Sequence, residues 1–299
     1  MIVNIKESKD VVVLINYNNA NDTLDCVQSI HNSTIDISVI IVDNASSEED
    51  YSKLKLIQND ILIIRSRHNL GFAGGNNLAI KYVIDNYNNI QSFILLNNDT
   101  VVEPDMFRLL KAKDDSKSIV VPKMLYYDDK NTIWYAGGYF NKWTGKAIHY
   151  GFNMKDYEND NNEVCEFATG CCILIPIDVL RKIGYLDDSY FMYCEDTEYC
   201  LRAKKAGIEI RYIHDAKLYH KVGRTSGGEE SSFCLYYMTR NRFRYLHDYR
   251  DYFFFTAIPF TFFSRLFRVL EYRFKRKMQY KAILRGMIDY HKGIKGKSY

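Results

Sequence analysis

Residues 11–47, VVVLINYNNANDTLDCVQSIHNSTIDISVIIVDNASS, predict a strand, a polar loop, a helix and a second strand, in that order. Val11 to Ile15 and Val39 to Val42 are short runs of aliphatic and β-branched residues, which are typical of buried strands. Between them, the polar residues 16–22 can cap a helix that runs from about Thr23 to His31. Each predicted strand therefore ends in side chains that can bind a ligand.

The same unit recurs further along the chain. Ile61 to Ile64 leads through a glycine-rich stretch into a predicted helix from Leu78 to Tyr87. Phe93 to Leu96 ends in polar residues, and Pro104 stands where the first turn of the next helix is expected. Four apolar strands that alternate with helices predict an α/β fold, with a Rossmann-like, mostly parallel sheet and helices on both faces. In such a sheet, ligands bind beyond the carboxyl ends of the strands.

From Ile119 the pattern changes to shorter strands. They are predicted at Trp134 to Phe140, at Phe167 to Ile175 with a break at Gly170, and at Ile208 to Tyr212. A helix is expected from about Asp196 to Ala206, because Gly207 can adopt a left-handed cap. We expect this second half to hold an acceptor.

The composition is that of a folded protein. The 299 residues are 47% hydrophobic and 26% charged, which supplies enough apolar surface for a sizeable core. The net charge of +3 is too small to indicate a nucleic-acid-binding protein. The cysteines form no C-x-x-C pair, which indicates reduced, packed thiols, and residues 1–10 lack the apolar run of a secretory signal. We therefore expect a cytoplasmic protein.

Residues 229–299 predict a basic, amphipathic helical extension. Tyr252 to Phe263 is strongly apolar, and many basic residues follow between Arg265 and Arg285. The apolar run is too short to span a bilayer core of about 30 Å. An apolar face beside cations suits a helix that lies in the membrane interface. Packing of these helices on the core, or in a homodimer, is the alternative.

Polar residues at three strand ends could bind a nucleotide or a metal. Asp43 could accept hydrogen bonds from a base or ribose, or could close an Asx-turn. The glycine-rich run Asn69 to Asn77 would let phosphates approach a helix N-terminus, or could form only a tight turn. Its spacing matches neither the dinucleotide fingerprint nor the P-loop. Asp99 could hold Mg²⁺ or Mn²⁺ on a diphosphate, or could be a helix N-cap or a turn residue.

Two further positions carry candidate chemistry. Glu195 and Asp196 open a predicted helix after an aromatic segment, where burial could raise the pKa of a carboxyl group. One of them could take the proton from a hydroxyl, or Glu195 could form a capping box with Glu198. His220 precedes a partly cationic, glycine-rich loop and could complete a metal site, or could be structural.

Taken in order, these segments resemble the family-2 glycosyltransferases of the glycosyltransferase A fold, in their rhamnosyltransferase-like branch. The resemblance runs from about Val11 to Gly228 and includes Val42-Asp43-Asn44-Ala45-Ser46, Asn69-Leu70-Gly71-Phe72-Ala73-Gly74-Gly75-Asn76, Leu95-Leu96-Asn97-Asn98-Asp99, Thr169-Gly170, Tyr193-Cys194-Glu195-Asp196, Glu198-Tyr199-Cys200-Leu201-Arg202 and His220. It implies a catalytic domain over residues 1–228, with a nucleotide-binding half at about 1–118 and an acceptor-binding half at 119–228.

The resemblance also implies roles for single residues. Asp43 would contact the base or ribose, Asp99 and His220 would bind the metal, Asp196 would be the general base, and Glu195 would orient it or contact the acceptor. The family motif has two carboxylates around the metal, whereas here only Asp99 stands in the motif. The other residues expected at the donor are Asn16, Tyr17, Asn69, Gly71, Gly74, Gly75, Asn76, Asn98 and Arg224, and those expected at the acceptor are Trp134, Thr169 and Gly170. Trp134 could equally belong to the core or to a hairpin.

The implied activity is inverting, metal-dependent hexosyl transfer from a nucleotide-diphosphate sugar, UDP- or dTDP-linked with rhamnose as a candidate. The acceptor would be a hydroxyl of a glycan or lipid-linked glycan in cell-surface polysaccharide synthesis, and the enzyme would lie peripherally on the inner face of the cell membrane. A retaining mechanism would need a nucleophilic carboxylate that the sequence does not place. A nucleotidyltransferase is the first alternative, although residues 16–22 lack its usual basic phosphate loop. A non-catalytic glycan- or membrane-binding scaffold is the second.

Overall fold

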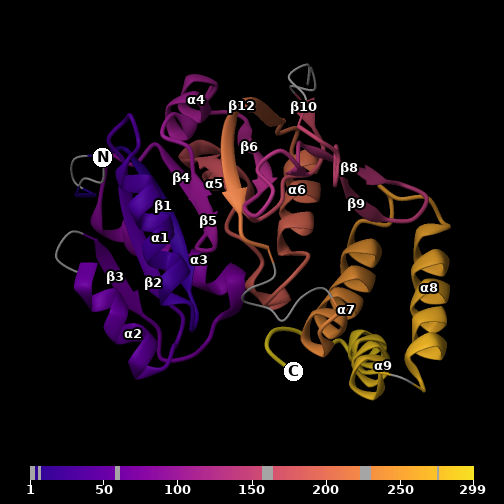
Figure 1. Ribbon diagram of the computed structural model, residues 1–299. Helices are drawn as coiled ribbons and strands as arrows, with labels where there is room; N and C mark the ends of the chain where they lie inside the picture. The colour runs from indigo at the N-terminus through magenta and orange to yellow at the C-terminus, as the bar shows by residue number, and fades with distance from the viewer. Residues whose placement is uncertain (1–3, 6–7, 58–60, 157–163, 223–229, 275) are drawn as a thin grey trace.

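The computed structural model describes residues 4–5, 8–57, 61–156, 164–222, 230–274 and 276–299 (Figure 1). These residues fold around a ten-stranded mixed sheet, with a separate two-stranded hairpin beside it. Helices pack around the sheet, and the C-terminal helices stand together at one end of the molecule (Figure 1).

The N-terminal half is a parallel sheet. Its strands are β1 (Asp10–Asn16), β2 (Ser38–Asp43), β3 (Leu62–Arg65) and β4 (Ser92–Asn97), in the spatial order β4-β1-β2-β3. The helical segments between them are α1 (Ala20–His31), α2 (Glu48–Leu54), the 3₁₀ helix η1 (Lys55–Ile57) and α3 (Gly71–Asn86). In the register, Asn16 lies opposite Asp43, and Ile15 lies opposite Asn97. The polar ends of these strands therefore meet at one edge.

Beyond β4 the sheet becomes mixed. Its further strands are β11 (Cys172–Pro176), β6 (Ile119–Tyr126), β12 (Ile210–His220) and β10 (Val164–Cys165), in that spatial order, while β5 (Thr100–Val102) pairs with β12 and β7 (Ile133–Tyr135) pairs with β6. The hairpin is formed by β8 (Gly138–Asn141) and β9 (Lys146–His149). The helical segments of this half are α4 (Met106–Ala112), α5 (Ile177–Ile183), the 3₁₀ helix η2 (Asp188–Tyr190) and α6 (Glu195–Lys205).

Three helices form the C-terminal part: α7 (Ser232–Asp248), α8 (Ala257–Tyr272) and α9 (Lys277–His291). α7 packs against both α8 and α9 (Figure 1). Their apolar side chains share one cluster with Phe191, which belongs to the segment that leads into α6. Across the described ranges, no helix is long and apolar enough to cross a bilayer.

The predicted α/β fold with C-terminal helices is confirmed, but several boundaries are wrong. The glycine-rich run does not precede α3, because the helix begins at Gly71 itself. Residues 134–140 do not form one strand, because Gly137 has a φ of 82° and separates β7 from β8. The predicted strand at 167–175 starts only at Cys172, and the strand predicted to end at Tyr212 continues to His220. The proposed divisions near residues 118 and 228 stay predictions.

Candidate active site

Asp43 closes β2 within a buried network of side chains. Its Oδ1 accepts a hydrogen bond from Nδ2 of Asn16 (3.1 Å), and the same nitrogen contacts Ser46 Oγ (3.0 Å) and Asp50 Oδ2 (2.9 Å). Its Oδ2 lies 3.2 Å from Nε of Arg65. The partners of Asp43 therefore lie on both neighbouring strands, and they fix the direction of its carboxylate without a local Asx-turn.

A pocket of ≈ 440 Å³ opens beside Asp43, at the carboxyl ends of β2 and β3. It is lined by Ala45, Ser46, Arg65, Ser66 and Arg67. Tyr17, just beyond β1, is 41% exposed, so its ring is available to a ligand. The volume is within the range of small-molecule sites, and the polar lining suits a base and a ribose.

Asn44 holds the start of α3 at the same edge. Its Oδ1 accepts from the N–H of Leu70 (2.8 Å), and its Nδ2 donates to the carbonyl oxygen of Gly71 (3.0 Å). Asn69 Oδ1 accepts from the N–H of Gly71 (2.8 Å). Gly71 has a φ of 73°, and a Cβ there would lie 2.0 Å from the carbonyl oxygen of Phe191. Only glycine fits where α3 meets the segment that leads into α6.

Gly74 and Gly75 lie inside α3, so the predicted phosphate-binding loop is wrong in shape. A Cβ at Gly75 would lie 3.1 Å from Cδ1 of Ile15, which shows that this glycine permits close helix–sheet packing. Asn76 is buried and donates to the carbonyl oxygen of Phe72 (2.9 Å). Their roles at the donor stay predictions.

The pairing of β5 with β12 brings Asp99 and His220 together. His220 lies opposite Thr100 in this antiparallel ladder, and the N–H of Lys221 donates to the carbonyl oxygen of Asp99 (2.9 Å). Nε2 of His220 lies 3.2 Å from Oδ1 of Asp99, and the two side chains are only 8% and 9% exposed. Nδ1 of His220 and Oδ1 of Asp99 have no hydrogen-bond partner among the described residues. Asp99 does not cap α4, because Asp105 is the N-cap of that helix, but it does lie in the turn between β4 and β5.

Side chains connect this pair to both ends of the site. Nδ2 of Asn98 donates to Oγ1 of Thr23 (2.8 Å), which itself donates to Oδ1 of Asn16 (2.9 Å) in the Asp43 network. In the other direction, the centre of the Trp134 ring lies 4.4 Å from the centre of the His220 ring and 5.0 Å from the centre of the His149 ring. The Asp99–His220 pair therefore lies between the Asp43 network and the hairpin that carries His149.

Glu195 and Asp196 differ in their surroundings although they are adjacent. Burial raises the pKa of Glu195, the negative charge of Asp196 raises it further, and Oε2 of Glu195 has no hydrogen-bond partner in the described part of the chain. Burial also raises the pKa of Asp196, but the N–H groups of Gly170 (2.9 Å) and Thr197 (2.6 Å) oppose this rise. His149 opposes it as well. The anion is therefore favoured at Asp196 and the neutral acid at Glu195.

The segment that leads into α6 has an unusual backbone conformation. Phe191, Tyr193 and Cys194 have φ values of 67°, 63° and 69°. Residues with a Cβ rarely adopt this left-handed region, and such strain persists only where the surrounding structure imposes it. The capping-box alternative for Glu195 is wrong, because Cys194 is the N-cap and provides no side-chain cap.

Helix α7 imposes that conformation. Nδ2 of Asn241 donates to the carbonyl oxygens of Tyr190 (3.0 Å), Met192 (2.9 Å) and Tyr193 (2.8 Å). Arg240 also donates to the carbonyl oxygen of Tyr190 (3.0 Å). No local pattern in the sequence points to either residue, because none reveals that α7 docks on this segment.

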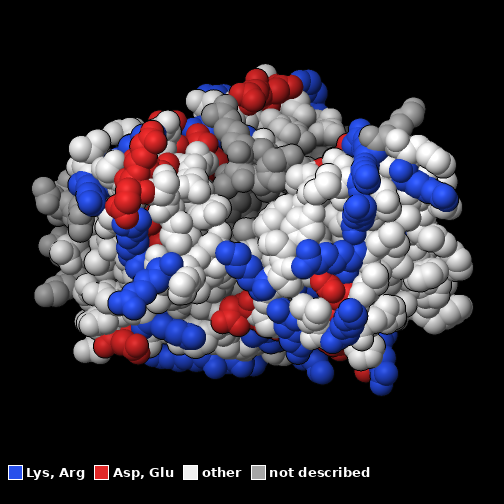
Figure 2. Space-filling model, turned by 90° about the horizontal axis from the view of Figure 1, so that it is seen from below, with Lys and Arg blue, Asp and Glu red and all other residues white. Residues whose placement is uncertain are grey.

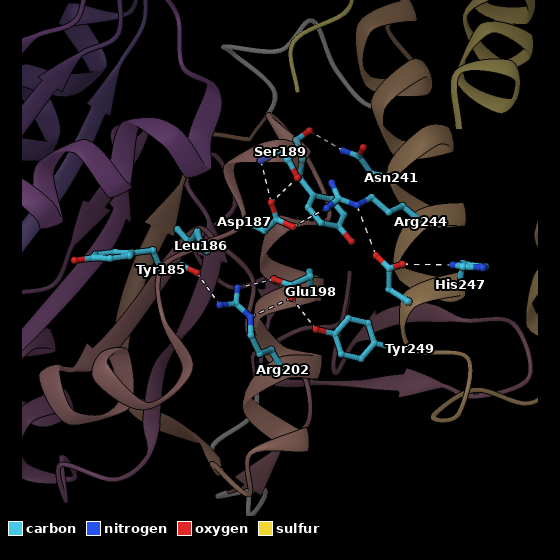
Figure 3. Close-up of polar contacts among 12 residues, drawn as sticks. Tyr185, Leu186, Asp187, Ser189, Glu198, Arg202, Asn241, Arg244, His247 and Tyr249 are labelled. Atoms are coloured by element: carbon cyan, nitrogen blue, oxygen red, sulfur yellow. Dashed lines mark hydrogen bonds and ion pairs between the residues drawn. The ribbon is translucent and has the colours of Figure 1, made fainter. Parts of the chain in front are cut away.

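Figure 3 shows further contacts between α7, α6 and the segment around η2. Arg244 donates to Asp187 (2.7 Å), and the hydroxyl of Tyr249 donates to Glu198 (2.7 Å). Arg202 contacts the other oxygen of Glu198 (2.7 Å). Glu198 therefore joins two helices, and α6 is held in place from the C-terminal side.

The structure thus links the Asp43 network to the Asp99–His220 pair, and it links that pair to Asp196 through aromatic rings. Thr169 is 7% exposed and precedes Gly170. A Cβ at Gly170 would lie 3.2 Å from atoms of the Phe72 ring. Asn44, His149, Arg240 and Asn241 join them as residues that the sequence analysis did not identify. Arg224 lies outside the described residues.

Comparison with known proteins identifies the family. The model of glycosyl transferase family 2 matches residues 11–184, which is more than half of the chain. The chain belongs to this family. The predicted resemblance is thereby confirmed, and the protein is a glycosyltransferase.

This glycosyltransferase has relatives of known name. It is 28% identical over 244 residues to the low-salt glycan biosynthesis hexosyltransferase Agl10 of Haloferax volcanii, and the aligned region covers 78% of this chain and 73% of that protein. It is 23% identical over 187 residues to the rhamnosyltransferase WbbL of Escherichia coli, which covers 59% and 70%. Mannosyltransferase PcManGT from Pyrobaculum calidifontis, solved with GDP-Man and Mn²⁺, matches with a TM-score of 0.56 over 95% of this chain and 87% of that one. At 10% identity, this likeness shows a common fold.

Proposed function

We propose that this glycosyltransferase inverts the anomeric centre and that Asp196 is its general base. The observation that supports this is the setting of Asp196: the N–H of Gly170 orients its carboxylate, and His149 and Trp134 connect it to the Asp99–His220 pair. Asp196 takes the proton of an acceptor hydroxyl while the hydroxyl oxygen bonds to the anomeric carbon. The bond from that carbon to the nucleotide diphosphate breaks, and its electrons leave with the diphosphate. Attack from the opposite face inverts the centre.

Asp99 and His220 would hold a divalent cation, Mn²⁺ or Mg²⁺, which would supply positive charge to the donor diphosphate. Both side chains are buried and retain polar atoms without hydrogen-bond partners in the described ranges. In those ranges, no group of three or more His, Cys, Asp or Glu side chains could hold a metal. One carboxylate with phosphate and water ligands is a usual arrangement for Mg²⁺. The bound ion would neutralise the charge of the leaving diphosphate.

The donor we propose is a UDP- or dTDP-sugar, with rhamnose as the candidate sugar. Asp43, Asn16 and the pocket beside Arg65 would receive the base and ribose. Similarity to WbbL supports rhamnose, and the GDP-Man complex of PcManGT supports a nucleotide-diphosphate donor on this fold.

The acceptor we propose is a hydroxyl of a glycan or lipid-linked glycan, placed near Trp134, Thr169 and Gly170. The C-terminal helices would hold the enzyme peripherally on the inner face of the cell membrane. Figure 2 shows Lys and Arg side chains on both halves of the face that it views. Such a face suits an anionic lipid surface.

Replacement of the base tests the proposal. Asp196→Asn should lower transfer by about 10²-fold or more, because the amide cannot accept the proton, while donor affinity is unchanged. Asp178→Asn on the exposed side of α5 is the matched control. The assay supplies Mn²⁺, glycan or lipid-linked acceptors, and UDP-, dTDP- or GDP-sugars in turn, and it measures released nucleotide diphosphate and the anomeric configuration of the product. Transfer by Asp196→Asn at the wild-type rate, or a retained configuration, would contradict it.

A further inference from the structure

Four cationic side chains gather where the β8–β9 hairpin meets α7 and α8. Arg242 of α7 donates to the carbonyl oxygen of Thr144 in the hairpin turn (2.6 Å). Lys146 follows in β9, and its Nζ lies 5.6 Å from the centre of the Phe260 ring on α8. Arg265 and Arg268 lie one and two turns further along the same helix. We call Lys146, Arg242, Arg265 and Arg268 the cationic cluster.

The inner half of the cationic cluster is buried and incompletely partnered. Arg242 is 6% and Arg265 is 7% exposed. The Nε atoms of both, and the hydroxyls of Thr144 and Thr261 nearby, have no hydrogen-bond partner in the described residues. Lys146 and Arg268 are exposed, so the cluster runs from the surface inward.

Among the described residues, no ion pair within 4.0 Å joins a carboxylate to any of these four cations, and Glu230, which lies within electrostatic reach of Arg268, pairs with Arg276. Burial lowers the pKa of Arg265 to about 10, and the charges of Arg242 and Arg268 lower it further. The same three arginines lower the pKa of Lys146, together with burial. Like charges held together in a partly dry site disfavour the folded state, and they are typical of sites that bind a charged ligand.

The cationic cluster lies on the side of the catalytic carboxylates. Burial raises the pKa of Cys194, the residue before Glu195, and the positive charges of Arg242 and Arg265 lower it. Tyr245 lies within electrostatic reach of Arg242, Arg265 and Asp196, and its hydroxyl donates to the carbonyl oxygen of Gly145 (2.6 Å). A ligand in the cluster would therefore approach Asp196 from the C-terminal helices, away from the Asp43 end.

We propose that the cationic cluster binds the phosphate groups of a prenyl diphosphate-linked acceptor. Arginine guanidiniums bind phosphate oxygens in pairs of charge-assisted hydrogen bonds, and the free Nε atoms supply such donors. The proposal rests on the proposed transferase function, because it places the sugar next to the phosphate within reach of Asp196.

The surface beside the cluster supports a lipid as the source of the phosphate. Phe260, in contact with Lys146, is 40% exposed, and Phe263 and Phe267 are 64% and 68% exposed on the same helix. Phe260 joins this exposed aromatic face of α8 to Lys146, and such a face suits a prenyl chain that leaves the phosphate and runs along the helix. A soluble sugar phosphate would gain nothing from this face.

Titration of the whole protein with farnesyl diphosphate tests the proposal. EDTA is present throughout, so that a cation cannot carry the diphosphate to Asp99 and His220. We expect Arg268→Gln and Arg242→Gln to weaken binding by at least about tenfold, because each removes a charge-assisted hydrogen bond. Lys281→Gln, an exposed cation on α9, should bind like the wild type. Arg265→Gln should weaken binding and raise the Tm, since it relieves repulsion within the cluster.

The outcomes test separately whether the cluster binds the ligand, whether the lipid chain contributes, whether the phosphate contributes, and whether the protein transfers a sugar. Equal affinity of wild type, Arg268→Gln and Arg242→Gln would overturn the site. Inorganic pyrophosphate binding as tightly as farnesyl diphosphate would overturn the lipid source, and farnesol binding as tightly would overturn the phosphate. Because no transfer is measured, loss of the proposed function would appear only in the transfer assay, where Asp196→Asn is the deciding variant.

Discussion

At the scale of single residues, Glu195 and Asp196 show how two adjacent carboxyl groups acquire different chemistry. Asp196 accepts backbone hydrogen bonds from Gly170 and Thr197, whereas Oε2 of Glu195 is buried without a partner in the described part of the chain. Hydrogen bonds stabilise a carboxylate, and burial without them stabilises the neutral acid. The hydrogen bonds therefore favour the carboxylate form of Asp196, whereas burial and the neighbouring charge favour the neutral acid form of Glu195.

This difference predicts a pH-dependent stability. Burial raises the pKa of Glu195 above its unfolded value, so the folded state binds a proton that the unfolded chain has lost. The stability contributed by neutral Glu195 is complete below the unfolded pKa and is lost as the pH rises through the folded pKa. Glu195→Gln, which cannot ionise, should exceed the wild type in Tm by a margin that grows between about pH 5 and pH 8.

Thermal unfolding at several pH values measures that margin. Glu49→Gln, at an exposed position of α2, is the matched control and should show a constant difference from the wild type. A margin for Glu195→Gln that stays flat or shrinks with rising pH would show that Glu195 is ionised in the folded protein.

At the scale of elements, the site depends on how α7 and α3 hold the segment that leads into α6. This segment has three non-glycine residues with positive φ, and its carbonyl groups bind Asn241 and Arg240. Its other side contacts α3, where the N–H of Phe72 donates to the carbonyl oxygen of Phe191 (2.9 Å). The C-terminal helices thus hold, through α7, the segment that leads to the proposed catalytic carboxylates.

Asn241→Ala should lower kcat more than it changes the donor KM. The variant removes three hydrogen bonds that orient the backbone before Glu195 and Asp196, with a stability loss of about 1–3 kcal/mol. Asn86→Ala, at an exposed position of α3 with one local hydrogen bond, is the control. An unchanged kcat for Asn241→Ala would remove α7 from the positioning of the carboxylates.

Gly71→Ala should destabilise the protein more than Gly207→Ala does. Both glycines have a positive φ near 70°, so both variants incur a left-handed conformational cost of about 1 kcal/mol. A Cβ at Gly207 meets nothing within 4 Å, whereas at Gly71 it would lie 2.0 Å from a carbonyl oxygen. Urea unfolding gives the free energy of unfolding of each variant, and the difference between the two variants is the cost of the steric clash at Gly71. Equal losses of stability would mean that α3 and the Phe191 segment can separate freely.

At the scale of the whole molecule, charge and apolar surface are gathered on the C-terminal helices. α8 buries Ala257, Thr261, Arg265, Val269 and Tyr272, which recur at helical spacing, and it exposes the aromatic residues between them. A helix with this pattern is expected to lie at a membrane surface, because apolar rings enter the headgroup boundary while nearby cations attract anionic lipid.

Flotation with phosphatidylcholine vesicles that contain phosphatidylglycerol tests membrane binding. The wild type should float, less so at high salt, and Phe263→Glu combined with Phe267→Glu should remain behind. Leu56→Glu is the control, since Leu56 is 81% exposed but lies in η1 of the N-terminal half. A wild type that never floats would leave α8 without a membrane role.

Local pattern was sufficient to predict the alternation of strands and helices in the first half. Each buried strand is a continuous aliphatic run, and a polar residue follows at its end, such as Asp43 at the end of β2 or Asp99 just beyond β4. The start of α3 could not be predicted in this way, because Gly71 to Asn77 lack helical propensity. Their helix is stabilised by Asn44, by contact with Ile15 and by the Phe191 segment.

The sequence alone determined the α/β fold, the family and the identity of the carboxylates at the strand ends, because these follow from short-range periodicity and from motifs in a set order. Tertiary structure decided what surrounds them. It set His220 against Asp99 through strand pairing, Asn241 against the segment before Glu195, and the cationic cluster where the hairpin meets α7 and α8. Such contacts join residues far apart in the chain, and their energies depend on burial and distance, which no local pattern contains.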